Sequence, residues 1–348
     1  MGSLLAYSGI TTKVKAMSSH LITDKQFSEM AFLETDIEAV EYLRKLPAYE
    51  DIFANMEGVE LHRGAIEQRL ILSQYKDFAK LYKFANLAQR KFLNLYFMHY
   101  EINILKKCLR STLGHQKAGI DLAVFQSFFE THSRLDLVKL MDSANIQELI
   151  ANLEGSVYYE QFSRLDDVGQ PTLFDYEMQL DLLYFKTIWK AKGKEFSGAE
   201  QKLLTSCYGS KLDLLNIQWI YRSKKYYHLQ SADIYALLIP IHHHLNVAQI
   251  RKLVEAPTLE EFYHALQTTY YGRKEGLESI DRPDLEDMAQ DMLHKIYSAT
   301  SRQNPYSIAI LNSYLYFKEE EIQKIITLIE SIRYRVNPEE ILSYVVKQ

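Results

Sequence analysis

The sequence predicts an all-α protein built from three related helical repeats. Only 13 glycines and 7 prolines occur in 348 residues, and long stretches rich in Leu, Ile, Glu, Lys and Gln separate them. Because so few turn-forming residues allow only short connections, long helices are expected. Apolar positions that recur every seven residues, together with landmarks that recur at long and nearly constant intervals, support the same fold class. Hydrophobic residues make up 47% of the chain, enough for a sizeable core.

The clearest predicted helix extends from Asn304 to Tyr334. Asn304 followed by Pro305 fits an N-cap with proline at the first helical position. An apolar seam follows, and Lys318 is the only charge in its second row; the seam consists of Ile308, Leu311, Leu315, Ile322, Ile325, Ile329 and Ile332. Such a helix is roughly 45 Å long, and its narrow seam requires another element packed along it. Asn337 and the proline after it repeat the cap and predict a short final helix.

Two sets of landmarks indicate repeats of about 110 residues. An N-cap residue and an apolar residue occur together three times, each time followed by a tyrosine twelve positions after the apolar residue. These landmarks are Asp36-Ile37 with Tyr49, Asn145-Ile146 with Tyr158, and Thr258-Leu259 with Tyr271. The intervals are 109 and 113 residues, and Ile104, Ile217 and Ile322 give intervals of 113 and 105 residues. The predicted repeats are residues 1–116, 117–228 and 229–348.

Each repeat is expected to hold a short capped helix, an irregular stretch and a long closing helix. The helices predicted in the first two repeats are 35–46, 68–86, 88–113 and 197–227. Gly209 is expected to break the last of these into two pieces. The loop at 114–119 is the expected boundary between the first two repeats, and the loop at 272–283 is expected to be the most mobile segment.

The composition argues against several classes of protein. A net charge of −5 gives no overall attraction to nucleic acid or to an anionic membrane. Cys108 and Cys207 are the only cysteines, which excludes a disulfide framework and fits a reducing cytosol. No run reaches the roughly 18 apolar residues that a membrane-spanning helix needs, so we expect a chain that is soluble alone, without direct membrane insertion. Motifs typical of nucleotide, zinc and hydrolase sites do not occur, so neither a cofactor nor a small-molecule substrate is expected.

Two runs of titratable residues invite a functional interpretation. Consecutive side chains on a helix diverge by about 100°, so histidines 242–244 cannot converge on one metal ion, and a polar surface run is favoured. Glutamates 319–321 diverge in the same way. They are interpreted as a solvated helix face rather than as a catalytic carboxylate pair.

Three stretches resemble the C subunit of V/A-type rotary ATPases, which is called d in eukaryotic vacuolar enzymes. The strongest resemblance lies in the C-terminal run NPYSIAILNSYLYFKEEEIQKIITLIESIRY, which is followed by NPEEI. The opening run YSGITTKVKAM is similar to the family pattern of a tyrosine followed by two spaced basic residues, with Lys13 and Lys15 where arginine is usual. The third stretch consists of the Asn-Ile pairs at 103–104 and 216–217, which are similar to the family's internal Asn-Leu helices.

The resemblance implies a non-catalytic adaptor in the central stalk of such a complex. It implies three pseudo-repeated units around a pseudo-threefold axis, forming a funnel whose wide mouth receives the rotor shaft made of the D and F subunits. The narrow side would rest on the membrane c ring, at the cytoplasmic face, in a complex that couples ATP hydrolysis or synthesis to proton or sodium transport. The residues alone leave two alternatives open, an unrelated cytosolic helical scaffold and an all-helical enzyme with a central cavity.

A basic cluster ends each predicted closing helix. The clusters are Lys106, Lys107 and Arg110, then Arg222, Lys224 and Lys225, and finally Arg333 and Arg335. Each cation at a helix C-terminus interacts favourably with the helix dipole and stabilises the helix by roughly 0.3 to 1 kcal/mol. If the repeats surround a threefold axis, the same cations would instead form a ring that suits an acidic partner surface. These eight residues are the candidate partner-binding residues.

Overall fold

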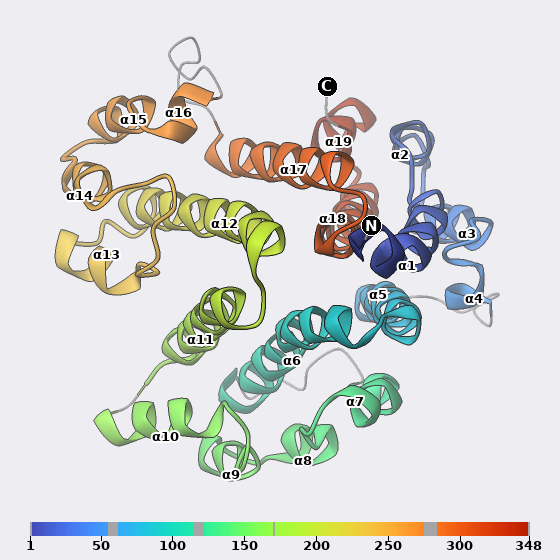
Figure 1. Cartoon of the computed structure of the whole chain (residues 1–348), viewed down its shortest axis with the longest axis horizontal. Helices are drawn as coiled ribbons and strands as arrows, with labels where there is room; N and C mark the ends of the chain where they lie inside the picture. Colours follow the sequence, from blue (N-terminus) through green and yellow to red (C-terminus); the bar gives the residue numbers. More distant parts are fainter. Residues whose placement is uncertain (1, 55–61, 115–121, 170, 275–283, 347–348) are drawn as a thin grey trace. The chain divides into compact units, whose positions relative to one another are not determined.

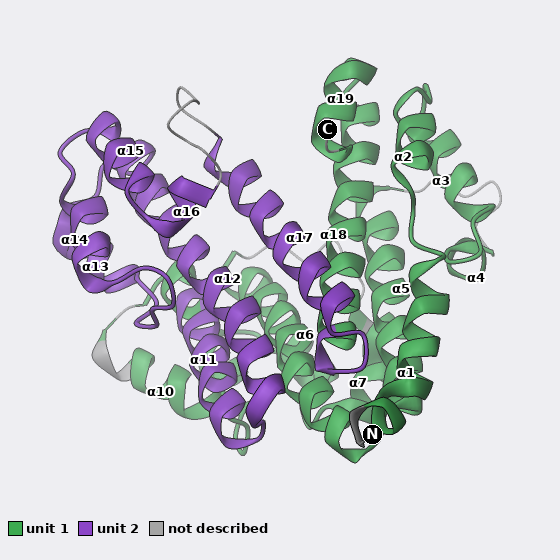
Figure 2. Cartoon of the chain, turned by 45° about the horizontal axis from the view of Figure 1, so that its top comes forward, with its two compact units in different colours: residues 1–176, 310–348 green, residues 177–309 purple. Residues whose placement is uncertain are grey.

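The computed structural model of the chain describes residues 2–54, 62–114, 122–169, 171–274 and 284–346 (Figure 1). Within these ranges the secondary structure is helical and includes no β-strand, which confirms the all-α prediction. The chain divides into two compact units, shown in Figure 2: unit 1 contains Met1–Tyr176 and Ile310–Gln348, and unit 2 contains Glu177–Ala309.

The helices of unit 1 come from both ends of the chain. The N-terminal ones are α1 (Gly2–Ser18), α2 (Asp24–Ala31), α3 (Asp36–Arg44), α4 (Glu50–Phe53), α5 (Arg63–Phe84) and α6 (Leu87–Gly114). They are followed by the 3₁₀ helix η1 (Leu122–Phe125), α7 (Gln126–His132), α8 (Leu137–Asp142), α9 (Ile146–Ala151) and α10 (Tyr159–Val168). The C-terminal ones are most of α18 (Ile308–Arg333) and α19 (Pro338–Val345).

The helices of unit 2 are consecutive in the sequence. They are most of α11 (Leu173–Lys194), α12 (Gly198–Lys225), α13 (Ser231–Leu237), α14 (Val247–Glu255), α15 (Leu259–Gln267), α16 (Tyr270–Lys274) and α17 (Leu285–Gln303). The helices α12 and α17 lie side by side along much of their length (Figure 1). The core of this unit joins α12 to α13, α14, α15 and α17.

The apolar seam of α18 packs against the first helices of the chain. Ile322, Ile325 and Ile329 are buried in one cluster with residues of α2, α3, α4 and α5, among them Phe27 and Leu43. The last helix, α19, lies beside α2 (Figure 2). The C-terminal end of the chain therefore completes the hydrophobic core that the N-terminal helices begin.

The start of α18 corrects one prediction. Asn304 is the C-cap of α17, with its N–H bonded to the carbonyl of Thr300, and it is not the N-cap of the following helix. The helix begins at Ile308 instead of after Asn304, because the hydroxyl of Ser307 accepts a hydrogen bond from the N–H of Ala309 at 3.2 Å. Serine supplies the side-chain cap, and Pro305 lies in the turn before it.

Side-chain caps begin the three short helices that carry the landmarks, at the predicted residue in two of them and one residue earlier than predicted in the first. Thr35, Asn145 and Thr258 each accept a hydrogen bond from the backbone N–H three residues later, at 3.2, 2.9 and 3.1 Å. In the first of these helices the cap is Thr35, and Asp36 is the first helical residue. Asn337 likewise caps α19, accepting from the N–H of Glu339.

The helix α12 is continuous through Gly209, so the predicted break at this glycine is wrong. A side chain at this position would lie within 2.6 to 2.9 Å of the His243 side chain. Glycine is used here because the loop that carries His243 packs directly against the helix backbone. The predicted loops at 114–119 and 272–283 fall mainly on residues 115–121 and 275–283, which lie outside the described residues.

Candidate functional site

The three tyrosines that mark the predicted repeats all donate a hydrogen bond to a carboxylate on a long helix. Burial, followed by the negative charge of the partner carboxylate, raises the pKa of Tyr49, Tyr158 and Tyr271, so each hydroxyl keeps its proton. The acceptors are Glu321 on α18, Glu101 on α6 and Asp213 on α12. We call these three contacts the tyrosine–carboxylate joints.

The joint in unit 2 is built around Asp213, whose side chain is fully buried. Tyr271 donates to Asp213 Oδ2 at 2.8 Å. The backbone N–H groups of residues 243–245 also donate to the two carboxylate oxygens, at 2.6 to 3.2 Å. Four donors around one carboxylate compensate for its removal from water, and they fix the loop before α14 onto α12.

The second joint connects α10 to α6 in unit 1. Tyr158, which lies just before α10, donates to Glu101 Oε2 at 2.7 Å, and Ser133 donates to the other oxygen of the same carboxylate. Burial raises the pKa of Glu101, and the hydrogen bonds from Ser133 and Tyr158 oppose this shift. The carboxylate therefore links the start of α10 and the end of α7 to one long helix.

The third joint contains a buried lysine. Tyr49 donates to Glu321 Oε1 at 2.5 Å, and Lys318 Nζ lies 2.8 Å from the same oxygen and 2.9 Å from the tyrosine hydroxyl. Asp77 Oδ2 lies 3.9 Å from Lys318 Nζ and accepts from Tyr314 at 2.7 Å. Lys318 is only 1% exposed, so its ammonium group compensates the negative charge of two carboxylates where water is excluded.

The buried position of Glu321 corrects the interpretation of glutamates 319–321 as a solvated face. Glu320 and Glu321 are 8% and 5% exposed. Glu319 Oε1 lies 2.8 Å from His99 Nε2 on α6. Two of the three glutamates are therefore buried, and the remaining one contacts a neighbouring helix.

The three joints are arranged in a cyclic order along the chain. The acid on α6 binds the tyrosine that follows it, and so does the acid on α12. The acid on α18, at the end of the chain, binds Tyr49 near the beginning. The acids Glu101, Asp213 and Glu321 are separated by 112 and 108 residues.

Histidines 242–244 lie in a loop between α13 and α14, not on a helix as the sequence interpretation assumed. The ring of His244 stacks on Tyr270, with centroids 4.0 Å apart, and contacts the ring of His243 at 3.9 Å. Burial lowers the pKa of both histidines, and the charge of Asp213 opposes the shift. Among the described residues no group of three potential metal-ligating side chains was found.

The lowered pKa of these two histidines predicts a pH-dependent stability. As the pH falls below 6.5, the two histidines take up protons in the unfolded chain before they do so in the folded chain. Their contribution to the free energy of unfolding is therefore fully present above pH 6.5 and is lost as the pH falls toward their lower pKa in the folded chain. The double variant His243→Gln, His244→Gln should therefore lose less stability than the natural protein between pH 7.5 and 5.5. Urea-unfolding midpoints at a series of pH values measure this, with His242→Gln as the matched control. If the urea-unfolding midpoints of the natural protein and of the double variant changed with pH in the same way, these two histidines would not be the cause of the pH dependence.

The basic cluster at the end of α6 lies partly inside unit 1. Lys106 and Lys107 are half-buried and Arg110 is exposed. Burial lowers the pKa of Lys107, and the negative charge of Glu67 on α5 partly offsets the effect. This lysine is therefore held within the fold rather than presented to solvent.

The basic cluster at the end of α12 makes contacts within unit 2. Arg222 forms an ion pair with Glu286 on α17 at 2.8 Å. Lys224 Nζ donates to the carbonyl of Ala256 at 2.8 Å, whereas Lys225 Nζ lies 5.0 Å from the ring centroid of Tyr221. Lys224 and Lys225 also line a pocket at this end of the helix.

The basic residues at the end of α18 have different environments. Arg333 binds Asp36 of α3 at 2.7 Å and Glu330 at 2.9 Å, so it fastens α18 to the N-terminal helices. Arg335 is exposed and adopts a positive φ of 57°. Its N–H and that of Val336 bond back to the last turn of α18, which is a Schellman motif with arginine where glycine is usual.

The contacts that the structure shows at these positions hold the helices of each unit together. The sequence interpretation identified the three tyrosines but missed their acidic partners, because the acids are distant in sequence. None of the helices within the described residues is long and apolar enough to cross a membrane.

Comparison with known proteins places these features in a family. The family described as ATP synthase (C/AC39) subunit, vATP-synt_AC39, matches residues 10–344. The chain is 25% identical to the C subunit of the A-type ATP synthase of Thermococcus kodakarensis over 346 residues, covering 97% of this chain and 90% of that protein. It is 24% identical to the corresponding A-type C subunit of Pyrococcus abyssi, covering 96% and 89% of the two chains. Because the match extends over nearly the whole sequence, the chain belongs to the ATP synthase (C/AC39) subunit family.

Proposed function

We propose that the chain is a non-catalytic adaptor in the central stalk of a V/A-type rotary ATPase. It couples the rotor shaft, formed by the D and F subunits, to the membrane c ring. The observation that carries the proposal is the recurrence of the tyrosine–carboxylate joints, each of which holds shorter helices onto a long one through buried polar contacts. A part that transmits torque must resist sliding between its helices, and buried, geometrically specific hydrogen bonds oppose such sliding.

The cyclic order of the joints supports three repeats around a pseudo-threefold axis. In a closed ring of three repeats, the long helix of each repeat contacts the short helices of the next, and the last contacts the first. The contacts from α6, α12 and α18 follow this order. The proposed repeats are residues 1–116, 117–228 and 229–348, with the joints linking neighbouring repeats. The wide mouth of the resulting funnel receives the shaft, and its narrow side rests on the c ring.

The exposed cations at the ends of the long helices supply part of the partner surface. Arg222 and Arg333 already form ion pairs with carboxylates of the same unit. Lys225 and Arg335 are exposed, and neither side chain forms an ion pair with a carboxylate among the described residues. These two cations are the ones best suited to an acidic partner, because their transfer to an interface breaks no ion pair within the described part of the fold.

The adaptor works at the cytoplasmic face of the membrane and is attached there through the c ring. The purified chain should remain soluble and should not bind protein-free anionic vesicles. It should sediment with vesicles that contain the reconstituted c ring. Sedimentation with protein-free vesicles would contradict attachment through a protein partner.

The double variant Lys225→Gln, Arg335→Gly tests the adaptor function with little disturbance of the fold. Glycine suits the positive φ of residue 335, so this change removes a charge and relieves backbone strain. We expect association with immobilised D–F shaft or with solubilised c ring to slow by about threefold to tenfold at low salt, and to become less dependent on salt. Biolayer interferometry at several salt concentrations measures the association rate constants for the shaft and for the c ring.

The control changes the net charge equally at exposed lysines that do not belong to the long helices. Lys45→Gln, Lys252→Gln removes two positive charges, one just after α3 and one on α14. Equal slowing in the control would show only a general charge effect. Failure of the natural chain to bind either partner would contradict the adaptor function itself.

A further inference from the structure

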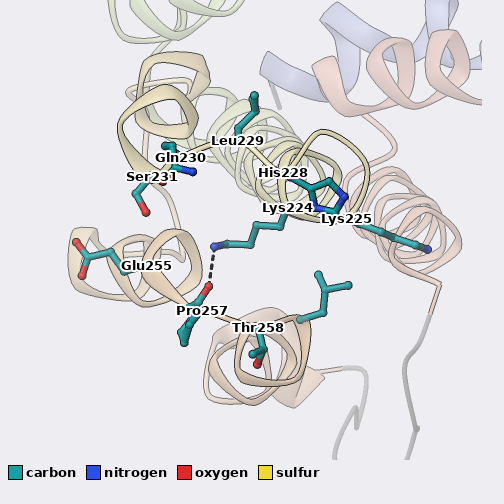
Figure 3. Close-up of a pocket in the computed structure, with 11 residues that line it drawn as sticks. Lys224, Lys225, His228, Leu229, Gln230, Ser231, Glu255, Pro257 and Thr258 are labelled. Atoms are coloured by element: carbon teal, nitrogen blue, oxygen red, sulfur yellow. Dashed lines mark hydrogen bonds between the residues drawn. The ribbon is translucent and has the colours of Figure 1, made fainter.

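A pocket of about 460 Å³ lies in unit 2, where α12 ends (Figure 3). Its walls come from the segment between α12 and α13 and from the turn between α14 and α15. This volume falls within the range of sites that hold small molecules or single side chains of a partner. The pocket lies outside the tyrosine–carboxylate joints, so its lining residues are not needed for those contacts.

Lys224 places a positive charge inside this pocket. Figure 3 shows its side chain crossing the pocket, and its Nζ donates to the carbonyl oxygen of Ala256 at 2.8 Å. An ammonium group has three N–H donors, so two remain for a ligand. Burial lowers the pKa of Lys224, which is consistent with an ammonium that is partly removed from water.

Other side chains that can donate hydrogen bonds line the same pocket. His228 and Gln230 line the pocket, and neither side chain forms a hydrogen bond with another described residue. The Thr258 hydroxyl oxygen accepts from the N–H of Glu261 at 3.1 Å, which leaves its O–H free to donate. The lining of the pocket thus includes several hydrogen-bond donors besides the one ammonium group.

The acidic side chain in the lining points away from the pocket. Glu255 is the only carboxylate among the described residues that line the pocket, and Figure 3 shows its side chain directed away from the pocket. Its Oε1 accepts from Tyr235 at 3.2 Å, and its Oε2 lies 4.0 Å from Arg251. Lys225 contributes its stem, while its ammonium group is held over the rings of neighbouring tyrosines. The interior therefore offers donors without a competing carboxylate.

The backbone of His228 turns the chain away from the end of α12. Its φ is 50°, in the left-handed region that glycine adopts freely and histidine adopts at a cost. The N–H of the next residue, Leu229, bonds back to the carbonyl of Ser223 in α12, so this positive φ belongs to the turn that ends the helix.

We propose that this pocket binds the carboxylate of an acidic side chain on a partner polypeptide, with Lys224 and His228 as its main donors. One ammonium group matches a single negative charge, and the other donors that line the pocket supply hydrogen bonds for the remaining lone pairs of the carboxylate. The inference rests on the proposed adaptor function only in taking the ligand to be part of a protein. The binding chemistry itself rests on the pocket.

The test uses the full-length chain with histidine ring signals observed by NMR. The probe is a blocked tetrapeptide with two adjacent glutamates, and the comparison peptide has glutamines in their place. We expect the glutamate peptide to shift the His228 ring signals and the glutamine peptide not to do so. Lys224→Met should weaken binding by about tenfold or more, because it removes the charge-assisted hydrogen bonds, whereas Lys252→Met should not change it.

His228→Gly provides a variant that keeps the turn intact. Glycine fits the positive φ, so the melting temperature should stay the same or rise while binding of the glutamate peptide, followed by isothermal titration, becomes weaker. Equal binding by natural protein, Lys224→Met and His228→Gly would overturn the proposal. So would binding of inorganic phosphate without binding of the glutamate peptide.

The same variants separate this proposal from the adaptor function. If the natural chain binds neither shaft nor c ring but binds the glutamate peptide through Lys224, the adaptor function fails and the pocket assignment stands. In the opposite case, the natural chain and His228→Gly assemble equally well with the shaft and the c ring, but the natural chain does not bind the glutamate peptide. The pocket assignment then fails and the adaptor function stands.

Discussion

Replacing Lys318 with methionine is expected to lower the free energy of unfolding by about 3 to 5 kcal/mol. The side chain is 1% exposed, and its ammonium group lies 2.8 Å from Glu321 and 2.9 Å from the Tyr49 hydroxyl. Without it, Glu321 and the nearby Asp77 would have no cation between them in the interior. Urea unfolding followed by circular dichroism measures the loss.

Two further variants test this explanation. Adding Glu321→Gln to Lys318→Met removes the uncompensated charge and should restore part of the lost stability. Lys83→Met, at an exposed position at the end of α5, should change stability by less than about 0.5 kcal/mol. If Lys318→Met and Lys83→Met have similar effects, the buried charges do not stabilise the third joint.

Replacing Gly272 with alanine is expected to cost about 3 kcal/mol or more, or to prevent correct packing of α15 and α16. A Cβ at this position would lie 2.2 Å from the carbonyl oxygen of Leu266 and 2.6 Å from the Cα of Gln267. Both contacts are with backbone, which cannot move without shifting the helix. The neighbouring Tyr271 would move as well, and with it the hydrogen bond to Asp213.

The matched control is Gly9→Ala in the middle of α1. Apart from its chain neighbours and the backbone of its own helix, no described atom lies within 4 Å of the Cβ position there, so alanine should stabilise the helix by about 0.5 to 1 kcal/mol. Thermal unfolding of both variants measures the difference, and hydrogen exchange locates the opening in α15 and α16. A Gly272→Ala protein as stable as the natural protein would contradict the close backbone approach.

Features that depend on local spacing were predictable from the sequence. The caps at Asn145 and Thr258 form because a side-chain oxygen and a backbone N–H three residues later lie close in space at a helix start, and the first cap was predicted one residue late, at Asp36 instead of Thr35. The seam of α18 followed from the helical period in the same way. The family followed from the resemblance of short runs, and the comparisons confirm it.

Features that depend on distant partners were not predictable. Glu321 looks like part of a solvated acidic face, because its partner Tyr49 is 272 residues away in the chain. Gly209 looks like a helix breaker, and only the packing of His243 shows why it is tolerated. Asn304 fits an N-cap or a C-cap equally well, and the preceding helix decides between them. The division into three repeats stays a prediction.

The packing of α18 and α19 onto α2 to α5 has a consequence for the synthesis of the protein. Phe27, Leu43 and Phe53 leave the ribosome early, but the isoleucines that cover them lie beyond residue 320. Translation adds roughly 5 to 20 residues per second, so on the order of 10 to 50 s separate the synthesis of the first helices from that of the last ones. During that interval an apolar surface is exposed, and a nascent chain that stops short of α18 cannot cover it. Release of truncated chains should therefore place a demand on chaperones that release of the complete chain does not.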